Sequence, residues 1–171
     1  MRSSRWSWVV LLSCVPLLGA CSSANRPSPQ GIQLRPVLSE SQATAASCPE
    51  PVQASASASN VRACSADGTV LYTLGAAAVT GDQVADLTVQ PGASNGYEVT
   101  VRFSDSGSSA FRSLTGELAS QDSPNNQFAF YARGVVQSSP YVSAAIDSGT
   151  AVVTGFANES EASQFVTDAA K

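Results

Sequence analysis

Residues 126–171 decide the fold: NQFAFYARGVVQSSPYVSAAIDSGTAVVTGFANESEASQFVTDAAK. Aromatic residues are dense in 127–133, and turn formers bound this segment, a composition that predicts a strand. In a strand, Phe128 and Phe130 point to one face and Tyr131 points to the other. The stretch therefore begins with a strand that carries aromatic side chains on both faces.

A two-residue turn follows this strand at Arg133 and Gly134, because glycine readily adopts the positive φ that a tight hairpin turn needs. Residues 135–138 then supply a returning strand. Pro140 ends the pairing, since proline has no N–H to donate to a neighbouring strand. The stretch thus predicts a β-hairpin followed by a crossing segment.

One more strand and a closing helix complete the stretch. The strand is predicted over 151–154, a short β-branched run. Asn158 with Glu161 three residues later is a variant of the capping box that begins helices. Apolar residues then recur at the spacing of one helix face: Ala162, Phe165, Val166 and Ala169. We expect that face to pack on the sheet.

The preceding segment supplies further strands and a first helix. Residues 70–74 and 84–89 are strand candidates, and 97–103 is the clearest strand because apolar and polar residues alternate along it. A helix is predicted over 106–119, where apolar residues recur at helical spacing after a cluster of N-cap candidates. This order predicts an α+β fold, with a mainly antiparallel sheet and two helices packed on one face.

The first twenty residues predict a signal peptide and not a folded element. Arg2 and Arg5 form a basic region, and residues 6–18 are mostly apolar but too short for a stable membrane span. The next residues, ending Leu-Gly-Ala-Cys at Cys21, resemble a bacterial lipobox. The resemblance implies a lipid on Cys21 and a protein anchored on the extracytoplasmic side of the plasma membrane, where two or more acyl chains hold durably. The alternatives are an ordinary secretory signal with an unrelated cysteine and a plain transmembrane anchor.

Of the four cysteines, Cys14 lies in the predicted signal peptide and Cys21 is the predicted lipid site, which leaves two. Cys48 and Cys64 form an even pair in an oxidising compartment, which predicts a disulfide. Closing a loop of about 15 residues would stabilise the fold by roughly 3 kcal/mol. The alternatives are free thiols or a metal site, but a metal needs three or four ligands and the chain has no histidine.

Residues 21–47 are rich in Ser, Pro, Gln and Ala without sustained periodicity, and they predict a flexible tether that holds the domain clear of the lipid surface. Residues 53–60 (QASASASN) have low complexity and lie within the disulfide loop, so we expect this loop to be mobile between its pinned ends. The predicted domain is therefore residues 48–171.

Composition narrows the function classes. The chain has 9 Lys+Arg against 13 Asp+Glu, a balance that argues against nucleic acid because nucleic acid requires a basic face. The lack of histidine excludes the usual Ser-His-acid and Cys-His catalytic sets. Asp82 and Asp86 have the spacing of metal ligands on one face, but solvated carboxylates at a turn and a strand edge are the preferred interpretation. We expect no enzyme activity, no cofactor and no metal.

Sequence blocks spread over the predicted domain resemble the head subdomain of the first large periplasmic domain of the SecD/SecDF family, accessory membrane proteins of the Sec translocase. The blocks include ACSADGT at 63–69, VTGDQV at 79–84, VTVRF at 99–103 and GVVQSSP at 134–140. The resemblance implies the head fold and a capacity to contact extended polypeptide. The partners that the resemblance implies are exported polypeptide, Sec components or other envelope proteins.

The chain departs from the family pattern at Arg133, where Asp or Asn usually precedes the hairpin glycine. At 171 residues we also expect none of the membrane helices that use proton flow in the family. The hypothesis is a non-catalytic, membrane-anchored lipoprotein that binds exported polypeptide or an envelope protein by sheet-edge addition, at an edge beside Arg133, Ser138 and Tyr141. The alternative is an envelope ligand-binding or sensor module for a cell-wall or lipid component, which a closed, mostly apolar pocket would favour.

Overall fold

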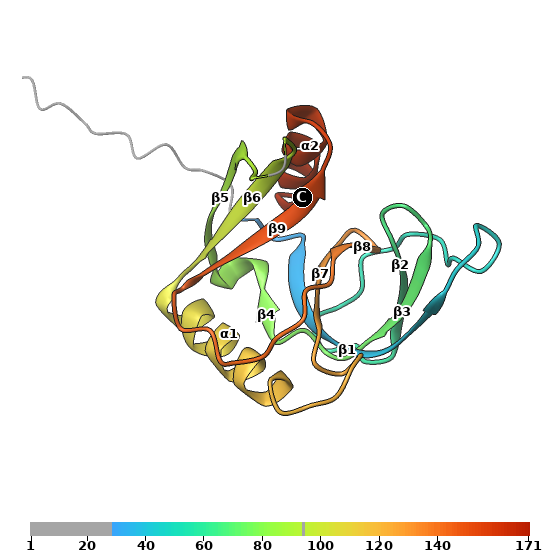
Figure 1. Cartoon of the computed structure of the whole chain (residues 1–171), viewed down its shortest axis with the longest axis horizontal. Coiled ribbons are helices and arrows are strands. Elements are labelled where there is room, and N and C mark those ends of the chain that lie inside the picture. The colour runs from blue at the N-terminus through green and yellow to red at the C-terminus, as the bar shows by residue number, and fades with distance from the viewer. Residues whose placement is uncertain (1–28, 94) are drawn as a thin grey trace, which may run out of the picture.

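The structure, a computed structural model, describes residues 29–93 and 95–171. The predicted signal peptide and the lipid site at Cys21 lie outside the described residues. The described part is mostly strands with two α-helices, so the predicted α+β class is confirmed. Its strands divide between two sheets, one closed and one open, that lie side by side (Figure 1).

Six strands form the first sheet, which we call the closed sheet because five of them form a ring. The five are β1 (Ile32–Gln42), β2 (Val61–Ser65), β3 (Val70–Leu74), β7 (Phe128–Ala132) and β8 (Val135–Ser138). The order is β3-β2-β8-β7-β1, and an additional pairing of β1 with β3 closes the ring. The short strand β4 (Val79–Thr80) also pairs with β1. All these pairings are antiparallel except that of β2 with β8.

The tether prediction is wrong where β1 runs, because β1 is central to the closed sheet. Its first half pairs with β7 and its second half with β3. Ile32 and Leu34 are buried against the open sheet and its helices. Gln33 and Arg35 are buried on the other face, and these polar residues together with Pro36 hide the strand periodicity from sequence inspection. The folded domain therefore starts well before residue 48.

Three antiparallel strands form the second sheet, which we call the open sheet. They are β5 (Val84–Pro91), β6 (Tyr97–Phe103) and β9 (Thr150–Phe156), in the order β5-β6-β9. The predicted alternation in β6 is confirmed, since Val99, Val101 and Phe103 are buried while Arg102 is exposed. One face of this sheet is therefore covered and the other faces solvent.

Helices α1 (Asp105–Leu118) and α2 (Glu159–Ala169) pack on the covered face of the open sheet, at its two ends (Figure 1). A 3-10 turn, Gly81–Gln83, joins β4 to β5. Ser104 caps α1 by accepting from the N–H of Gly107 at 3.2 Å. Asn158 caps α2 as predicted, because its Oδ1 accepts from the N–H of Glu161 at 3.0 Å.

The core has two parts, and β7 separates them. Phe128 and Phe130 point into the larger part, between the closed sheet and the helix-covered open sheet. Their rings meet edge to face with centroids 5.2 Å apart, and Phe111 of α1 lies 5.4 Å from Phe128. Tyr131 points into the interior of the closed sheet. The predicted two-faced aromatic strand is confirmed.

The Cys48–Cys64 disulfide is present, with Cα atoms 5.6 Å apart. Within its loop we call residues 51–58 the strap. We expected this loop to be mobile, but the structure fastens it to the closed sheet. The phenol of Tyr131 donates to the carbonyl of Val52 at 2.7 Å and accepts from the N–H of Ala54 at 2.9 Å.

Arg35 of β1 also holds the strap against the closed sheet, and its side chain is fully buried. Its guanidinium donates to the carbonyls of Ser55, Ala58 and Gly75 at 2.6–2.7 Å. It also donates to Gln33 Oε1 at 2.8 Å. The alanines of the strap are half-buried and its serines are exposed, so the repeated Ala-Ser pattern is that of a segment lying flat on a surface.

Candidate functional site

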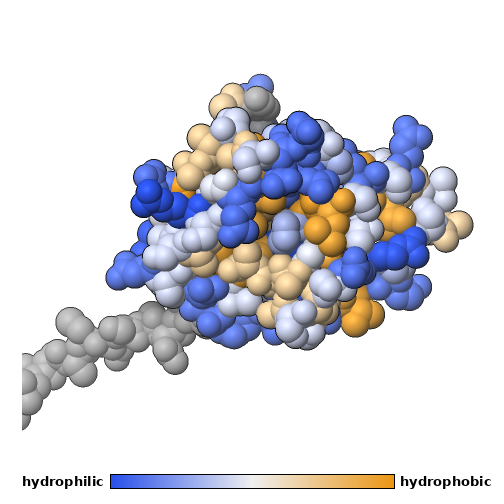
Figure 2. Space-filling model, turned by 90° about the horizontal axis from the view of Figure 1, so that it is seen from below, coloured by the Kyte–Doolittle hydropathy of each residue, from blue (hydrophilic) through white to orange (hydrophobic). Residues whose placement is uncertain are grey.

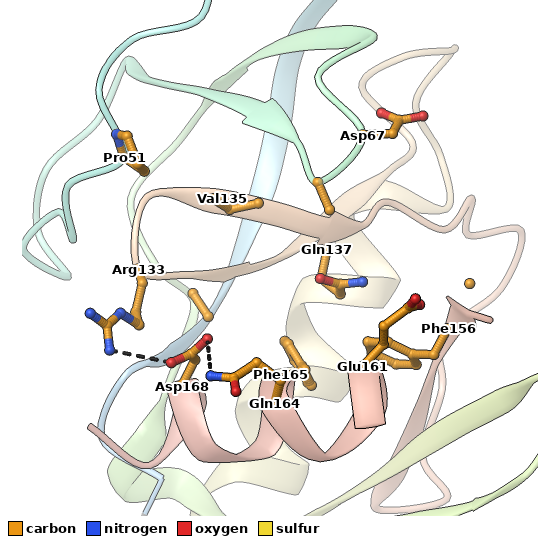
Figure 3. A pocket seen from close by; sticks show the side chains of 13 residues that line it. Pro51, Asp67, Arg133, Val135, Gln137, Phe156, Glu161, Gln164, Phe165 and Asp168 are labelled. Carbon is orange, nitrogen blue, oxygen red and sulfur yellow. Dashed lines mark hydrogen bonds and ion pairs between the residues drawn. The ribbon is translucent and has the colours of Figure 1, made fainter. Parts of the chain in front are cut away.

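A groove of about 640 Å³ lies between α2 and the β7–β8 hairpin, and we call it the hairpin groove (Figure 3). Phe156 and Phe165 lie at its base, and Val135 lines it from the hairpin. Polar side chains complete the lining: Asp67, Arg133, Gln137, Glu161, Gln164 and Asp168. Both phenylalanines are mostly buried, so the groove is shallow and offers the edges of their rings.

The turn of the hairpin confirms the two-residue prediction. Arg133 has φ 51° and Gly134 has φ 87°, the two positive values that a type I′ turn requires. The strap crosses directly over Gly134, where an added Cβ would lie 2.2 Å from the backbone nitrogen of Val52. The N–H of Arg133 donates to Gln53 Oε1. The strap therefore holds the tip of the hairpin in place beside α2.

Asp168 joins the hairpin tip to α2. Its Oδ1 lies 3.3 Å from Arg133 Nη1, and its Oδ2 accepts from Gln164 Nε2 at 3.1 Å (Figure 3). The same Oδ1 lies 3.5 Å from Lys171 Nζ. The Arg133 side chain is half exposed, so solvent screens this ion pair and its contribution to stability is small. Its effect is to orient the groove wall.

Two further carboxylates lie on the rim of the groove. Glu161 is committed to the cap of α2, where its oxygens accept from the N–H of Ala157 and from Asn158. Asp67 accepts from the hydroxyls of Ser65 and Thr69 and from the N–H of Thr69, and these hydrogen bonds lower the pKa of Asp67, that of Ser65 most. Asp67 therefore stays ionised, and the rim is acidic.

The three predicted binding residues do not share one site. Arg133 lines the hairpin groove, whereas Tyr141 lines a separate cavity of about 450 Å³ and is 66% exposed. Ser138 pairs with Phe130 of β7 and lines neither.

The predicted edge is also partly covered. β8 pairs with β7 on one side and with β2 on the other, through Val135 and Val136. Pairing with β2 ends there, so the main chain from Gln137 onward is the part of β8 that β2 leaves uncovered among the described residues. The predicted exposed sheet edge is therefore limited to the last residues of β8 and the segment that follows it.

Sequence reasoning missed most of the groove wall. Gln164 and Asp168 lie four residues apart on α2, on a face that the apolar pattern leaves polar. Asp67 comes from the β2–β3 turn, and Pro51 from the strap. The helix pattern identified Phe165 as a core residue, and the structure shows that it also forms the base of the groove.

Exposed apolar side chains of the described residues are scattered over several elements. Apolar patches on the face shown in Figure 2 are separated by polar side chains. The large exposed apolar residues come from different elements: Leu38, Val52, Tyr141 and Val152. Apolar side chains scattered in this way need no partner to explain them.

The space between the open sheet and the helices, where a closed ligand pocket was the alternative, is filled by aromatic rings. Phe103 and Phe111 lie with ring centroids 4.7 Å apart, and Phe156 and Phe165 lie 5.5 Å apart. The hairpin groove and the Tyr141 cavity open at the surface instead.

Among the described residues, no group of three or more His, Cys, Asp or Glu side chains could hold a metal ion. The same part of the chain contains no helix long and apolar enough to cross a bilayer.

The geometry defines a class of protein, an α+β module in which a closed sheet and a helix-covered open sheet share a core and flank a surface groove. Residues 57–167 match the family model of the SecDF P1 head subdomain, and the chain belongs to that family. The expected resemblance is confirmed. The match begins after β1, the strand that sequence reasoning also missed.

Relatives agree with this assignment. The chain is 43% identical over 93 residues to the protein translocase subunit SecD of Streptomyces coelicolor, a match covering 53% of this chain and 16% of SecD. A crystal structure of SecDF in a super-membrane-facing form has a TM-score of 0.56 at 17% identity, covering 84% of this chain and 19% of that one. A second structure, of a membrane component SecDF that enhances protein export, has the same TM-score and identity, and 63% of it is covered. At 17% identity these structures show a shared fold alone.

Proposed function

We propose that this chain is a lipid-anchored, non-catalytic module that presents a SecDF-head-like domain outside the membrane and binds exported polypeptide in the hairpin groove. The observation that carries the proposal is the groove itself, whose apolar base lies beside the uncovered main chain of β8. One relative is a translocase subunit, and one solved neighbour is described as enhancing protein export. The lipid anchor rests on the lipobox at Cys21.

The groove has the features that suit an extended chain of varied sequence. Main-chain groups of residues 137–139 can pair with any polypeptide backbone, because such pairing does not depend on side-chain identity. Pro140 ends this edge, because it has no N–H and its carbonyl accepts from the N–H of Phe128. Ring edges of Phe156 and Phe165 offer a small apolar surface for one side chain of the bound chain. Burying a whole apolar side chain contributes roughly 1.5–3 kcal/mol, so partial burial gives weak, reversible binding. Transient contact is what a protein in transit requires.

Gln164→Trp tests the groove. Gln164 is an exposed residue of α2 that lines the groove, so a bulky ring there fills the space without changing the core. Ser163→Trp is the matched control, on the same helix and exposed but outside the groove lining. A photocrosslinking residue placed at Gln137 in intact cells should capture exported chains in the wild type and in Ser163→Trp, and several-fold fewer in Gln164→Trp. The export function fails if translocating chains and Sec components are never captured.

Cys21→Ser tests the anchor separately. Without the thiol no thioether lipid can form, so the protein should move from the membrane fraction to the soluble fraction on cell fractionation. A variant that stays with the membrane would contradict the lipid anchor while leaving the groove proposal intact.

A further inference from the structure

A second cavity, of about 450 Å³, lies between the second half of β1, β3 and the segment after β8. We call it the tyrosine pocket. Tyr72 and Tyr141 contribute its two aromatic rings, and Glu40 contributes its carboxylate. Gln127 and Ser139 are among its other polar lining residues. None of these residues belongs to the hairpin groove.

Two partly buried hydrogen bonds lead to the carboxylate of Glu40, which is an exposed residue. Ser139 Oγ donates to Gln127 Oε1 at 2.9 Å, and Gln127 Nε2 donates to Glu40 Oε2 at 3.3 Å. Gln127 is only 2% exposed, so the amide has a fixed orientation. Neither ion pair within the described residues involves Glu40. The pocket therefore presents a carboxylate that is hydrogen-bonded by a neutral amide and is not balanced by a described cation.

The tyrosines differ in exposure, and together they complete a site for a cation. Tyr72 is almost buried, whereas Tyr141 projects into solvent at 66% exposure. Burial raises the pKa of Tyr72 above its ordinary value, and the nearby charge of Glu40 raises it further. The phenol therefore stays neutral at physiological pH, and the local potential is negative. Neutral aromatic faces beside a carboxylate attract ammonium and guanidinium groups.

We propose that the tyrosine pocket binds the cationic end of an arginine or lysine side chain of a polypeptide. The argument is charge complementarity between that cation and the carboxylate of Glu40, with the ring of Tyr141 covering the alkyl stem. This inference rests on the proposed function, because it takes the same polypeptide as the partner. It adds a chemical preference that the shallow hairpin groove does not provide.

The two sites lie along one extended segment. Val135 and Gln137 line the hairpin groove, and Ser139 and Tyr141 line the tyrosine pocket. At about 3.3 Å per residue, the four residues from Gln137 to Tyr141 cover about 13 Å. A partner extended along this segment would place a basic side chain about four residues from the side chain that it lays in the groove.

Titration of the detergent-solubilised full-length protein with two peptides tests the proposal. The first is acetyl-Gly-Gly-Arg-Gly-Gly-amide, and the second replaces arginine by citrulline, which has nearly the same shape and no charge. Amide NMR signals of Glu40, Tyr72 and Tyr141 should shift with the arginine peptide. The citrulline peptide should bind at least five-fold more weakly.

Glu40→Gln should weaken arginine-peptide binding at least three-fold while keeping an oxygen that accepts from Gln127. Glu50→Gln is the control for overall charge, because Glu50 is exposed and outside the pocket. Tyr141→Ala should weaken binding, and Tyr141→Phe, which keeps the ring, should not.

Equal binding of both peptides would overturn the proposal, as would equal losses in Glu40→Gln and Glu50→Gln or shifts confined to the hairpin groove. These outcomes are independent of the Gln164→Trp crosslinking result. The pocket and the proposed function can therefore fail separately.

Discussion

Arg35 is the residue on which the closed sheet and the strap both depend. A buried guanidinium is usually balanced by a carboxylate, but the groups that Arg35 contacts are three carbonyls and the amide oxygen of Gln33. Its carbon Cζ also lies 5.3 Å from the ring centre of Tyr131. Burial lowers the pKa of Arg35, and Tyr131 partly offsets this. The guanidinium still carries its proton at neutral pH, as arginine does throughout proteins.

Arg35→Ala should lower the free energy of unfolding by about 3–5 kcal/mol, because it leaves several buried carbonyls without a donor. Chemical denaturation measures this change. Arg112→Ala is the control, since Arg112 is exposed on α1 and its loss should change stability by no more than about 0.5 kcal/mol. Similar small losses in both variants would mean that the strap does not depend on Arg35.

Tyr72 predicts how stability depends on alkaline pH. Its pKa is raised in the folded protein, so above pH about 10 the folded state holds a proton that the unfolded state releases. The free energy of unfolding should therefore fall as the pH rises past 10. Tyr72→Phe should flatten this decline in denaturant titrations at pH 9, 10 and 11. Parallel slopes in the two proteins would argue against a buried, proton-bearing phenol.

At the level of elements, two features of the hairpin turn disfavour a side chain at Gly134: the positive φ of its backbone and the strap that crosses over it. Gly134→Ala meets both restrictions, whereas Gly68→Ala meets only the first, because Gly68 has φ 72° and nothing lies within 4 Å of an added Cβ. Gly68→Ala should cost about 1 kcal/mol and Gly134→Ala at least about 2 kcal/mol more. Thermal unfolding followed by circular dichroism measures both. Equal costs would show that the strap moves aside freely.

Elements with a regular pattern could be predicted from the sequence. β6 alternates, β7 is aromatic and bounded by turns, and both helices carry a cap and an apolar stripe. β1 could not be predicted, because its interior-facing positions include Gln33 and Arg35 and it contains Pro36. Burial of these polar side chains is favourable only because carbonyls of the strap accept their hydrogen bonds. The strap lies some 20 residues further along the chain, and its sequence has no pattern that indicates this contact.

The candidate site was predictable only at Arg133, where the turn signal is local. The rest of the groove is assembled from the strap, the β2–β3 turn and α2, which are distant in sequence. The tyrosine pocket likewise combines Glu40, Tyr72 and Tyr141 from three segments. Of these three, only Tyr141 was among the predicted binding residues, as part of the edge beside Arg133 and Ser138.

For the molecule as a whole, the shared core couples the two sheets. Ile32 of the closed sheet and Phe165 of α2 belong to the same hydrophobic cluster. Phe165→Ala should therefore destabilise the entire domain by roughly 3–5 kcal/mol. Hydrogen exchange should show amides of β3 and β6 losing protection together. A loss below about 1 kcal/mol, or β6 opening while β3 stays protected, would mean that the sheets unfold independently.

The placement of β1 also changes how far the domain can travel from a lipid on Cys21. The chain is fastened already at Gly31, whose N–H donates to the carbonyl of Ala169 at 2.7 Å, and Pro29 lies against Gly81. Eight peptide units from Cys21 to Pro29 span at most about 28 Å. On the proposed anchor, the head therefore stays within a thin layer above the bilayer surface. Confinement to that layer raises its local concentration toward a chain that emerges at the same surface, which favours the occupation of weak binding sites.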